Sequence, residues 1–187
     1  MRKPQDARER ILDAAERLFA ENGFDATPTS RVAKQAAVPK GLLFYYFPTK
    51  RELLNTLVGE RLDLGPIDTA SLIEEDNPVR SLLNLTSRLD ELQRASDVLR
   101  VIIWREQHTH PEIGAKLSEH RGQLQSVIER VLRASAVGPV TAARIRAAAQ
   151  AWLAIVTMRP IVEAAHETAP LAALAELVCD GLRAKPA

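Results

Sequence analysis

The feature of this 187-residue chain that most limits its fold is an apolar repeat every three to four residues, which recurs along most of its length. This spacing places apolar side chains on one face of a helix, whereas a half-buried strand alternates apolar and polar residues. No stretch of the sequence alternates convincingly. The clearest stripes are Ile11, Leu12, Ala15, Leu18 and Phe19, then Leu82, Leu85, Leu89 and Leu92, and then Ile113, Leu117, Leu124, Ile128 and Val131. The pattern predicts an all-α chain of about nine helices.

Helix boundaries are expected where side chains can satisfy the free N–H groups of a first turn or where a residue can adopt a left-handed conformation. Two segments, Asp6–Glu9 and Thr49–Glu52, have the spacing of a capping box. Gly23 is expected to end the first helix. The boundaries that follow predict a short second helix over about 28–36 and a third over about 39–47.

The segment "KGLLFYYFPTK", residues 40–50, holds four of the eight aromatic residues of the chain, including both tyrosines. On a helical wheel, Leu43, Phe44 and Phe47 share one side, and we expect them to pack inward. The other side would present Gly41, Leu42, Tyr45 and Tyr46 outward. Exposed aromatic residues on a short helix favour a surface that has a partner. The alternative is an ordinary core helix whose tyrosines extend their hydroxyl groups to solvent.

Two short helices joined by a tight turn, after a longer amphipathic helix, have the plan of a helix-turn-helix. DNA is a partner suited to the outward set, because hydroxyl and ammonium groups contact phosphates and a residue without a side chain permits close approach. Charge agrees: residues 1–54 hold ten Lys and Arg against seven Asp and Glu, whereas residues 55–187 hold fifteen against seventeen. The candidate DNA contacts are Thr27, Thr29, Ser30, Pro39, Lys40, Gly41, Leu42, Tyr45, Tyr46 and Lys50.

The run "RILDAAERLFAENGFDATPTSRVAKQAAVPKGLLFYYFPTKRELL" carries several short motifs. They include Gly23 and Phe24 followed by Thr27, then Val32-Ala33, and then an aromatic segment that ends in Thr49-Lys50. On these residues the chain, over about residues 8–54, resembles the DNA-binding region of the TetR family of bacterial transcriptional regulators.

The resemblance implies a three-helix DNA-binding domain over residues 1–50, with the helix-turn-helix motif at about 28–47. It also implies a larger helical domain over residues 51–187 that binds a ligand and dimerises. The last two long helices would form the homodimer, which would bind a pseudo-palindromic DNA operator. A small-molecule effector would release the DNA, and repression is the usual mode of the family.

Three positions depart from the pattern of the family. Ala37 stands where the turn usually has Gly, and a left-handed Ala costs about 1 kcal/mol. Pro39 replaces the usual Ser, and Phe44 replaces the usual Tyr, so one hydroxyl that could contact phosphate is missing. An alternative reading follows from these departures, namely a helical ligand-binding or interaction protein whose DNA-binding head is weakened.

Candidate ligand contacts in the larger half are sparse. They are Trp104, His108, His120 and Trp152, and for both tryptophans and for His120 an ordinary core position is the alternative. The segment "EQHTHPE", residues 106–112, brings two Glu and two His together, and these residue types suggest a metal site as one interpretation. Alternate residues on a helix face apart, however, and Pro111 interrupts the segment, so we expect no metal site.

The sequence contains none of the usual catalytic or cofactor-binding motifs, and the single Cys179 lies in a helix rich in Ala and Leu. We therefore expect a protein that is not an enzyme and that needs no cofactor. The longest apolar run is too short to span a bilayer, and no disulfide can form within the chain. These features favour a cytoplasmic protein without a membrane partner.

Overall fold

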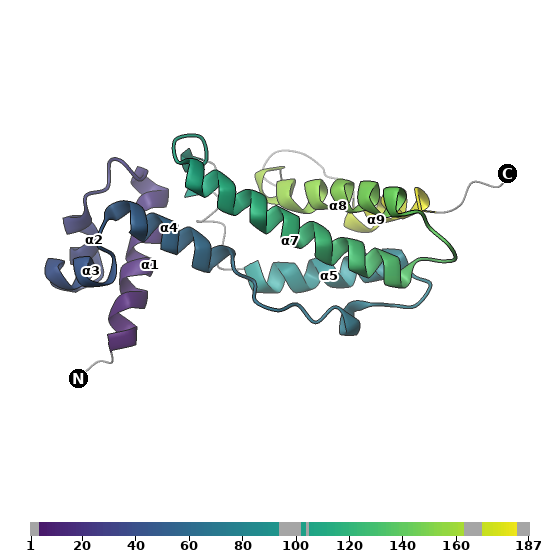
Figure 1. The fold of residues 1–187 in the computed structure, drawn as a ribbon, viewed down its shortest axis with the longest axis horizontal. Coiled ribbons are helices and arrows are strands. Elements are labelled where there is room, and N and C mark those ends of the chain that lie inside the picture. The colour runs from purple at the N-terminus through teal and green to yellow at the C-terminus, as the bar shows by residue number, and fades with distance from the viewer. Residues whose placement is uncertain (1–3, 94–101, 104, 163–169, 183–187) are drawn as a thin grey trace. The chain divides into compact units, whose positions relative to one another are not determined.

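A computed structural model of the chain describes residues 4–93, 102–103, 105–162 and 170–182. Within these ranges the chain forms helices and no strands, so the all-α prediction is confirmed (Figure 1). The helices are α1 (Pro4–Asn22), α2 (Thr29–Gln35), α3 (Lys40–Tyr46), α4 (Lys50–Leu62), α5 (Pro78–Gln93), α7 (Pro111–Ser135), α8 (Ala142–Val162) and α9 (Leu171–Asp180), with a short 3-10 turn at Ala70–Leu72. Residues 102–103 and 105–106 are also helical. None of the described helices is both long and apolar enough to cross a bilayer.

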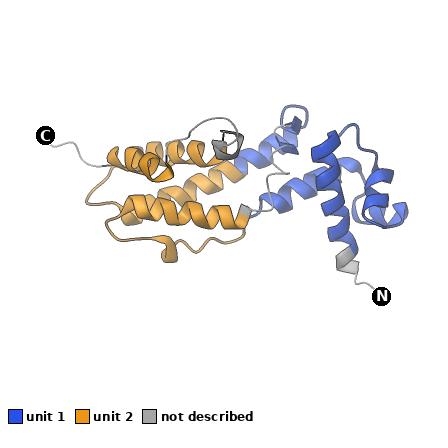
Figure 2. Cartoon of the chain, turned by 180° about the vertical axis from the view of Figure 1, so that it is seen from behind, with its two compact units in different colours: residues 1–63, 95–119 blue, residues 64–94, 120–187 orange. Residues whose placement is uncertain are grey.

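The chain divides into two compact units, which Figure 2 distinguishes by colour. Unit 1 contains residues 1–63 and 95–119, and unit 2 contains residues 64–94 and 120–187. Helix α7 therefore contributes its first nine residues to unit 1 and the rest to unit 2. The division of function after residue 50 that the sequence suggests remains a proposal.

The core of unit 1 is built on the apolar stripe of α1. Ile11, Leu12, Ala15, Leu18 and Phe19 are all buried, as the helical spacing predicts. Helices α2 and α4 pack against α1, and α3 packs on α2 and α1. Three short elements thus share one long supporting helix.

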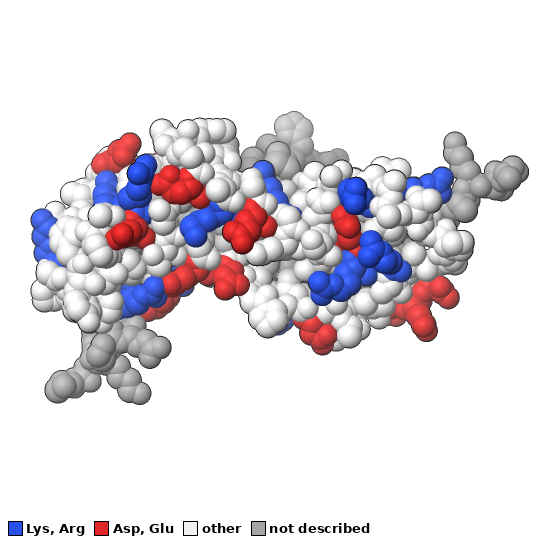
Figure 3. All heavy atoms as spheres, viewed as in Figure 1, with Lys and Arg blue, Asp and Glu red and all other residues white. Residues whose placement is uncertain are grey.

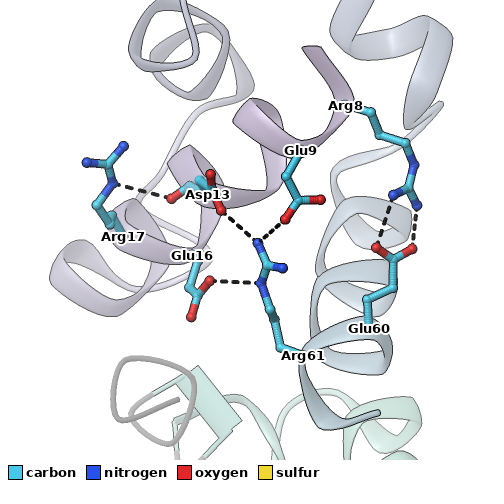
Figure 4. Close-up of polar contacts among 7 residues, drawn as sticks. All are labelled: Arg8, Glu9, Asp13, Glu16, Arg17, Glu60 and Arg61. Atoms are coloured by element: carbon cyan, nitrogen blue, oxygen red, sulfur yellow. Dashed lines mark hydrogen bonds and ion pairs between the residues drawn. The ribbon is translucent and has the colours of Figure 1, made fainter. Parts of the chain in front are cut away.

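Charged side chains join α1 to α4 beside this core (Figure 4). Arg61 Nη2 lies 2.7 Å from both Glu9 Oε1 and Asp13 Oδ1, and its Nε donates to Glu16 Oε2 at 3.1 Å. Burial raises the pKa of the Glu16 carboxyl, although the hydrogen bond from Arg61 opposes this effect. A single guanidinium therefore holds three successive positions of one helical face.

A second pair joins the same two helices (Figure 4). Arg8 binds the Glu60 carboxylate with both terminal nitrogens, in a bidentate arrangement. The hydrogen bond from Arg8 lowers the pKa of Glu60.

The core of unit 2 is formed by α5, the later part of α7, α8 and α9. Its largest fully buried side chain is Trp152, which has no exposed surface. The indole Nε1–H donates to Thr86 Oγ1 at 3.1 Å, so the polar group of the buried ring is satisfied. Leu82, Leu85 and Leu89 of α5 are buried in the same cluster, as expected from the stripe.

The helix boundaries test the capping predictions. Thr49 and Glu52 form the expected capping box at the start of α4, and Gly23 has the expected left-handed conformation with φ +84°. The other capping box is wrong: α1 begins at Pro4, so Asp6 lies inside the helix and cannot cap it. The spacing of Asp6 and Glu9 alone does not distinguish an N-cap Asp from an Asp in the first turn, where an acidic residue is also favourable. This ambiguity explains the error.

Candidate nucleic-acid interface

Helix α3 is held in place by two side chains one turn apart. Leu43 and Phe47 are buried in the core of unit 1, and the Phe47 N–H donates to the Leu43 carbonyl oxygen at 2.8 Å. The Arg8 guanidinium lies over the Phe47 ring, 5.5 Å from its centroid. Leu43 within α3 and Phe47 directly after it therefore anchor this short helix to the core.

The turn before α3 contains the left-handed residue that the sequence suggested. Ala37 has φ +51°, and its N–H donates to the Lys34 carbonyl oxygen at 3.1 Å. The Val38 N–H donates to the Ala33 carbonyl oxygen at 3.0 Å, which closes the end of α2 in the manner of a Schellman motif. The turn has the expected geometry in spite of its alanine, at a cost of about 1 kcal/mol.

The outward side of α3 exposes aromatic surface. Tyr45 is 78% exposed and Gly41 is exposed, with no atom within 4 Å of the place where a Cβ would lie. Leu42 is half-buried. Tyr46 is also half-buried, because its ring packs at 5.3 Å from Tyr45 and 6.4 Å from Phe47, measured between centroids.

Phe44 does not belong to the buried set, so its expected inward packing is wrong. The side chain is 38% exposed, and the Lys40 ammonium lies 5.7 Å from the centroid of its ring. Lys40 and Phe44 are four residues apart and therefore neighbours on the helix surface. Leu43 and Phe47 are buried in the core and Tyr46 packs against it, so the inward side of the helix is the side away from Phe44. The family pattern contained the missing signal, since a position that usually holds Tyr is compatible with exposure.

Thr27 is also different from its expected role. Its side chain has no exposed surface, and its hydroxyl contacts the carbonyl oxygens of Leu18 at 3.2 Å and Gly23 at 2.8 Å. It therefore braces the link after α1 and cannot reach DNA. Its neighbour Thr29 is half-buried and Ser30 is exposed, so their hydroxyls stay candidates.

Lys50 has protein contacts at the start of α4. Its ammonium donates to the Asp25 carbonyl oxygen at 3.2 Å and lies 4.4 Å from the centroid of the Phe24 ring. The residue is half-buried, whereas Pro39 and Lys40 are exposed. A phosphate contact by Lys50 stays a prediction.

Residues 105–112 brace the start of the helix-turn-helix, a role that sequence reasoning missed. The Phe24 N–H donates to Glu106 Oε1 at 3.1 Å, and Arg105 Nη1 donates to the Ala20 carbonyl oxygen at 2.8 Å. The His110 ring packs edge-on against Phe24, with 4.8 Å between centroids. The sequence marked this segment as a metal candidate because charged and imidazole groups cluster there, but it did not reveal their partners some eighty residues earlier.

The same segment contains an ion pair to α4. Glu112 Oε1 lies 2.8 Å from Arg51 Nε, and His110 lies between Glu106 and Glu112 at 3.5 and 3.8 Å. Among the residues with a defined placement, no group of three or more His, Cys, Asp or Glu is arranged to hold a metal ion.

The candidate ligand contacts do not form one described cluster. His108 is exposed in unit 1, whereas His120 and Trp152 are buried in unit 2. Trp152 packs in the apolar core, which is the alternative considered for it. Trp104 lies outside the described residues. A ligand pocket lined by these residues stays a prediction.

Figure 3 shows basic and acidic side chains interspersed over the visible face, without a large area of one sign. In α2 and α3, the exposed Ser, Lys and Arg side chains are Ser30, Arg31, Lys34 and Lys40.

The two short helices α2 and α3, the left-handed turn between them and their packing on α1 define a helix-turn-helix. Residues 11–57 match the family model described as bacterial regulatory proteins, tetR family. This segment of the chain therefore resembles the DNA-binding region of that family.

Three similar proteins illustrate the match. The transcriptional repressor AcnR of Corynebacterium efficiens is 29% identical over 134 residues, which span 70% of this chain and 64% of AcnR. A tetR-family regulatory protein from Rhodococcus RHA1 has a TM-score of 0.70 at 21% identity, covering 96% of this chain and 98% of its own. FadR of Bacillus subtilis, solved in complex with stearoyl-CoA, has a TM-score of 0.59 at 20% identity, covering 93% and 96%. At these identities, the similarity of the two solved structures to this chain concerns the fold alone.

Proposed function

We propose that this protein is a DNA-binding transcriptional regulator that recognises a pseudo-palindromic operator as a homodimer and is released by a small molecule. The observation that carries the proposal is the exposed aromatic side of α3, with Tyr45 78% exposed, inside the segment that matches the family model. Phosphate contacts would position the helix, and contacts to base edges would select the sequence. Repression is the mode we assign, by analogy with AcnR.

A salt titration of DNA binding tests this proposal. Fluorescence anisotropy with a duplex selected from a random library should give a log–log slope of several units, because phosphate contacts release counterions. Lys40→Ala should reduce the slope by about one. Lys116→Ala is the matched control, since Lys116 lies on α7 outside residues 11–57 and should leave the slope unchanged.

The alternative, a helical ligand-binding protein with a weakened head, predicts a different outcome. In that case no duplex would emerge from the selection, and no binding would appear even at low salt. Ala37 is relevant here, because the turn keeps its left-handed geometry with an alanine in it. A formed turn favours the regulator.

Dimerisation would use α8 and α9. Leu177 of α9 is 71% exposed, and α8 exposes several alanines that permit close helix packing. Leu177→Asp should therefore convert a dimer into a monomer in sedimentation equilibrium. Because the Leu177 side chain is exposed in the single chain, the substitution should leave the helical content of the protein, measured by circular dichroism, unchanged. A variant that remains dimeric would contradict this choice of interface.

The effector would bind in the larger half, outside residues 11–57. FadR in complex with stearoyl-CoA supports the idea that this fold accommodates a small molecule. Both tryptophans, Trp104 and Trp152, lie outside the segment that matches the family model. Intrinsic fluorescence therefore offers a direct screen: an effector should change tryptophan emission and weaken operator binding at the same concentration.

A further inference from the structure

The outward side of α3 has an unusual chemistry for a surface that selects DNA sequence. We call Lys40, Gly41, Leu42, Phe44 and Tyr45 the reading face. None of the seven residues of α3 is Arg, Asn, Gln, Asp or Glu. The side chains that usually distinguish adenine and cytosine in the major groove are therefore absent from this helix, and Lys40 is its one residue of a type that contacts guanine.

What the reading face offers instead is apolar surface. Phe44 is 38% exposed and Leu42 is half-buried, although both are large apolar side chains on a helix whose core contacts are already made by Leu43 and Phe47. The thymine methyl is the apolar group that a normal base pair presents in the major groove. Gly41, beside them, leaves room for the backbone to approach.

The position of Phe44 is supported by its neighbour. The Lys40 ammonium lies 5.7 Å from the ring centroid, so the cation occupies one side of the ring and favours a fixed orientation. The positive charge of Lys40, next to the exposed Phe44 ring, is complementary to a phosphate beside the groove. The exposed aromatic is thus both preorganised and directed toward a polyanion.

We propose that Phe44 and Leu42 select operator sequence by contacting thymine methyl groups, while Lys40 contributes affinity that is independent of sequence. This inference rests on the proposed function. It makes Phe44 a specificity-determining residue, where relatives with a tyrosine would add a hydroxyl.

Replacing thymine by deoxyuridine tests the inference, because the change removes one methyl group and keeps every hydrogen bond of the base pair. Each thymine of the selected duplex is replaced in turn, and binding of the full chain is measured by anisotropy. At the thymines under α3 the affinity should fall about fourfold, the equivalent of one methyl-sized group no longer buried. At the other thymines it should not change.

Variants assign the effect to residues. Phe44→Ala should abolish the deoxyuridine penalty at one position and Leu42→Ala at another, and Phe44→Leu should retain part of it. Lys40→Met should weaken binding to all duplexes and lower the salt slope by about one, but keep the penalty unchanged. Because Phe44 and Lys40 are exposed, the variants should fold, which thermal unfolding would verify.

The outcomes separate the two proposals. If no duplex binds at low salt, the proposed function fails. If the selected duplex binds and every deoxyuridine version binds equally well, the function stands and methyl recognition is overturned. If a penalty exists but persists in both Phe44→Ala and Leu42→Ala, these side chains are not the readers.

Discussion

The two units differ in the kind of contact that joins their helices. In unit 1, charged side chains connect α1 to α4 and connect residues 105–112 to the chain around Phe24. In unit 2, the described helices meet mainly through apolar side chains around Trp152, whose hydrogen bond to Thr86 is itself buried. Exposed ion pairs contribute little free energy but have defined geometry, whereas apolar contacts contribute most of the free energy and are less directional.

This difference agrees with the tasks proposed for the units. A surface that selects DNA sequence needs its short helices at fixed distances and angles. A helical domain that accommodates a small molecule needs stability from a large core more than it needs one exact arrangement. The comparison therefore predicts that substitutions in unit 2 change stability most, and that charge substitutions matter more in unit 1 than in unit 2.

The largest effect should come from Trp152→Ala. Removing the largest fully buried side chain leaves a cavity and an unpaired Thr86 hydroxyl, and should lower the free energy of unfolding by about 3–5 kcal/mol. Urea denaturation at one fixed protein concentration measures it. Trp152→Phe keeps most of the volume and loses the hydrogen bond, so about 1–2 kcal/mol is expected. A loss below that of Trp152→Phe for the alanine variant would mean that apolar packing does not dominate unit 2.

Arg61→Met should have the next largest effect, about 2 kcal/mol near neutral pH, because three carboxylates lose their common partner. Burial already raises the pKa of Glu16 in the folded protein above its unfolded value, and the loss of Arg61 should raise it further. The folded state then holds the Glu16 proton more tightly, which stabilises it below the unfolded pKa. This stability is lost as pH rises through the folded pKa.

The cost of Arg61→Met should therefore decrease as pH falls toward the ordinary pKa of glutamate, about 4.3. Urea denaturation of both proteins at several pH values measures this trend. The double variant Arg61→Met with Glu16→Gln is the control, since it removes the buried carboxylate and should recover much of the loss at neutral pH. A penalty that is independent of pH would show that Glu16 is not its source.

Ala37→Gly should stabilise the protein by about 1 kcal/mol, because glycine adopts the left-handed conformation without strain. Ala36 is the matched control. It is buried and right-handed, with φ −73°, so Ala36→Gly should destabilise by about 1 kcal/mol. Stability changes of opposite sign for Ala37→Gly and Ala36→Gly, measured by thermal unfolding, would show that the backbone strain of the turn lies at Ala37.

Much of unit 1 could be predicted from the sequence, because the signals there are local. The stripe of α1, the left-handed Gly23, and the capping box of Thr49 and Glu52 each depend on residues a few positions apart, whereas the left-handed conformation of Ala37 was suggested by the family pattern. Phe44 was misplaced because a helical wheel of seven residues does not define where the buried sector ends.

The bracing role of residues 105–112 was beyond the reach of sequence patterns. Glu106 and the Phe24 N–H are 82 positions apart, and Arg105 and the Ala20 carbonyl are 85 apart. A clustered Glu and His segment is compatible with a metal site, a surface or a set of backbone contacts, and only the packing of the chain distinguishes them. Thr27 is similar, because a buried threonine hydroxyl that donates to carbonyl oxygens cannot be distinguished in sequence from an exposed one that contacts DNA.

The smallest effects should come from single ion pairs, and they sharpen the comparison between the units. Glu91→Gln removes the exposed pair with Arg88 within α5 of unit 2 and should change the free energy of unfolding by less than about 0.5 kcal/mol.

Glu60→Gln removes the bidentate pair with Arg8 that joins two helices of unit 1, and should lower the free energy of unfolding by about 0.5–1 kcal/mol. Because Arg8 lowers the pKa of Glu60, this contribution is present above the unfolded pKa and lost as pH falls through the folded one. Urea denaturation at pH 7 and in acid should reveal this pH dependence as a difference between the wild-type protein and Glu60→Gln. Equal effects at the two sites would remove the distinction between charge as a connector in unit 1 and charge as surface in unit 2.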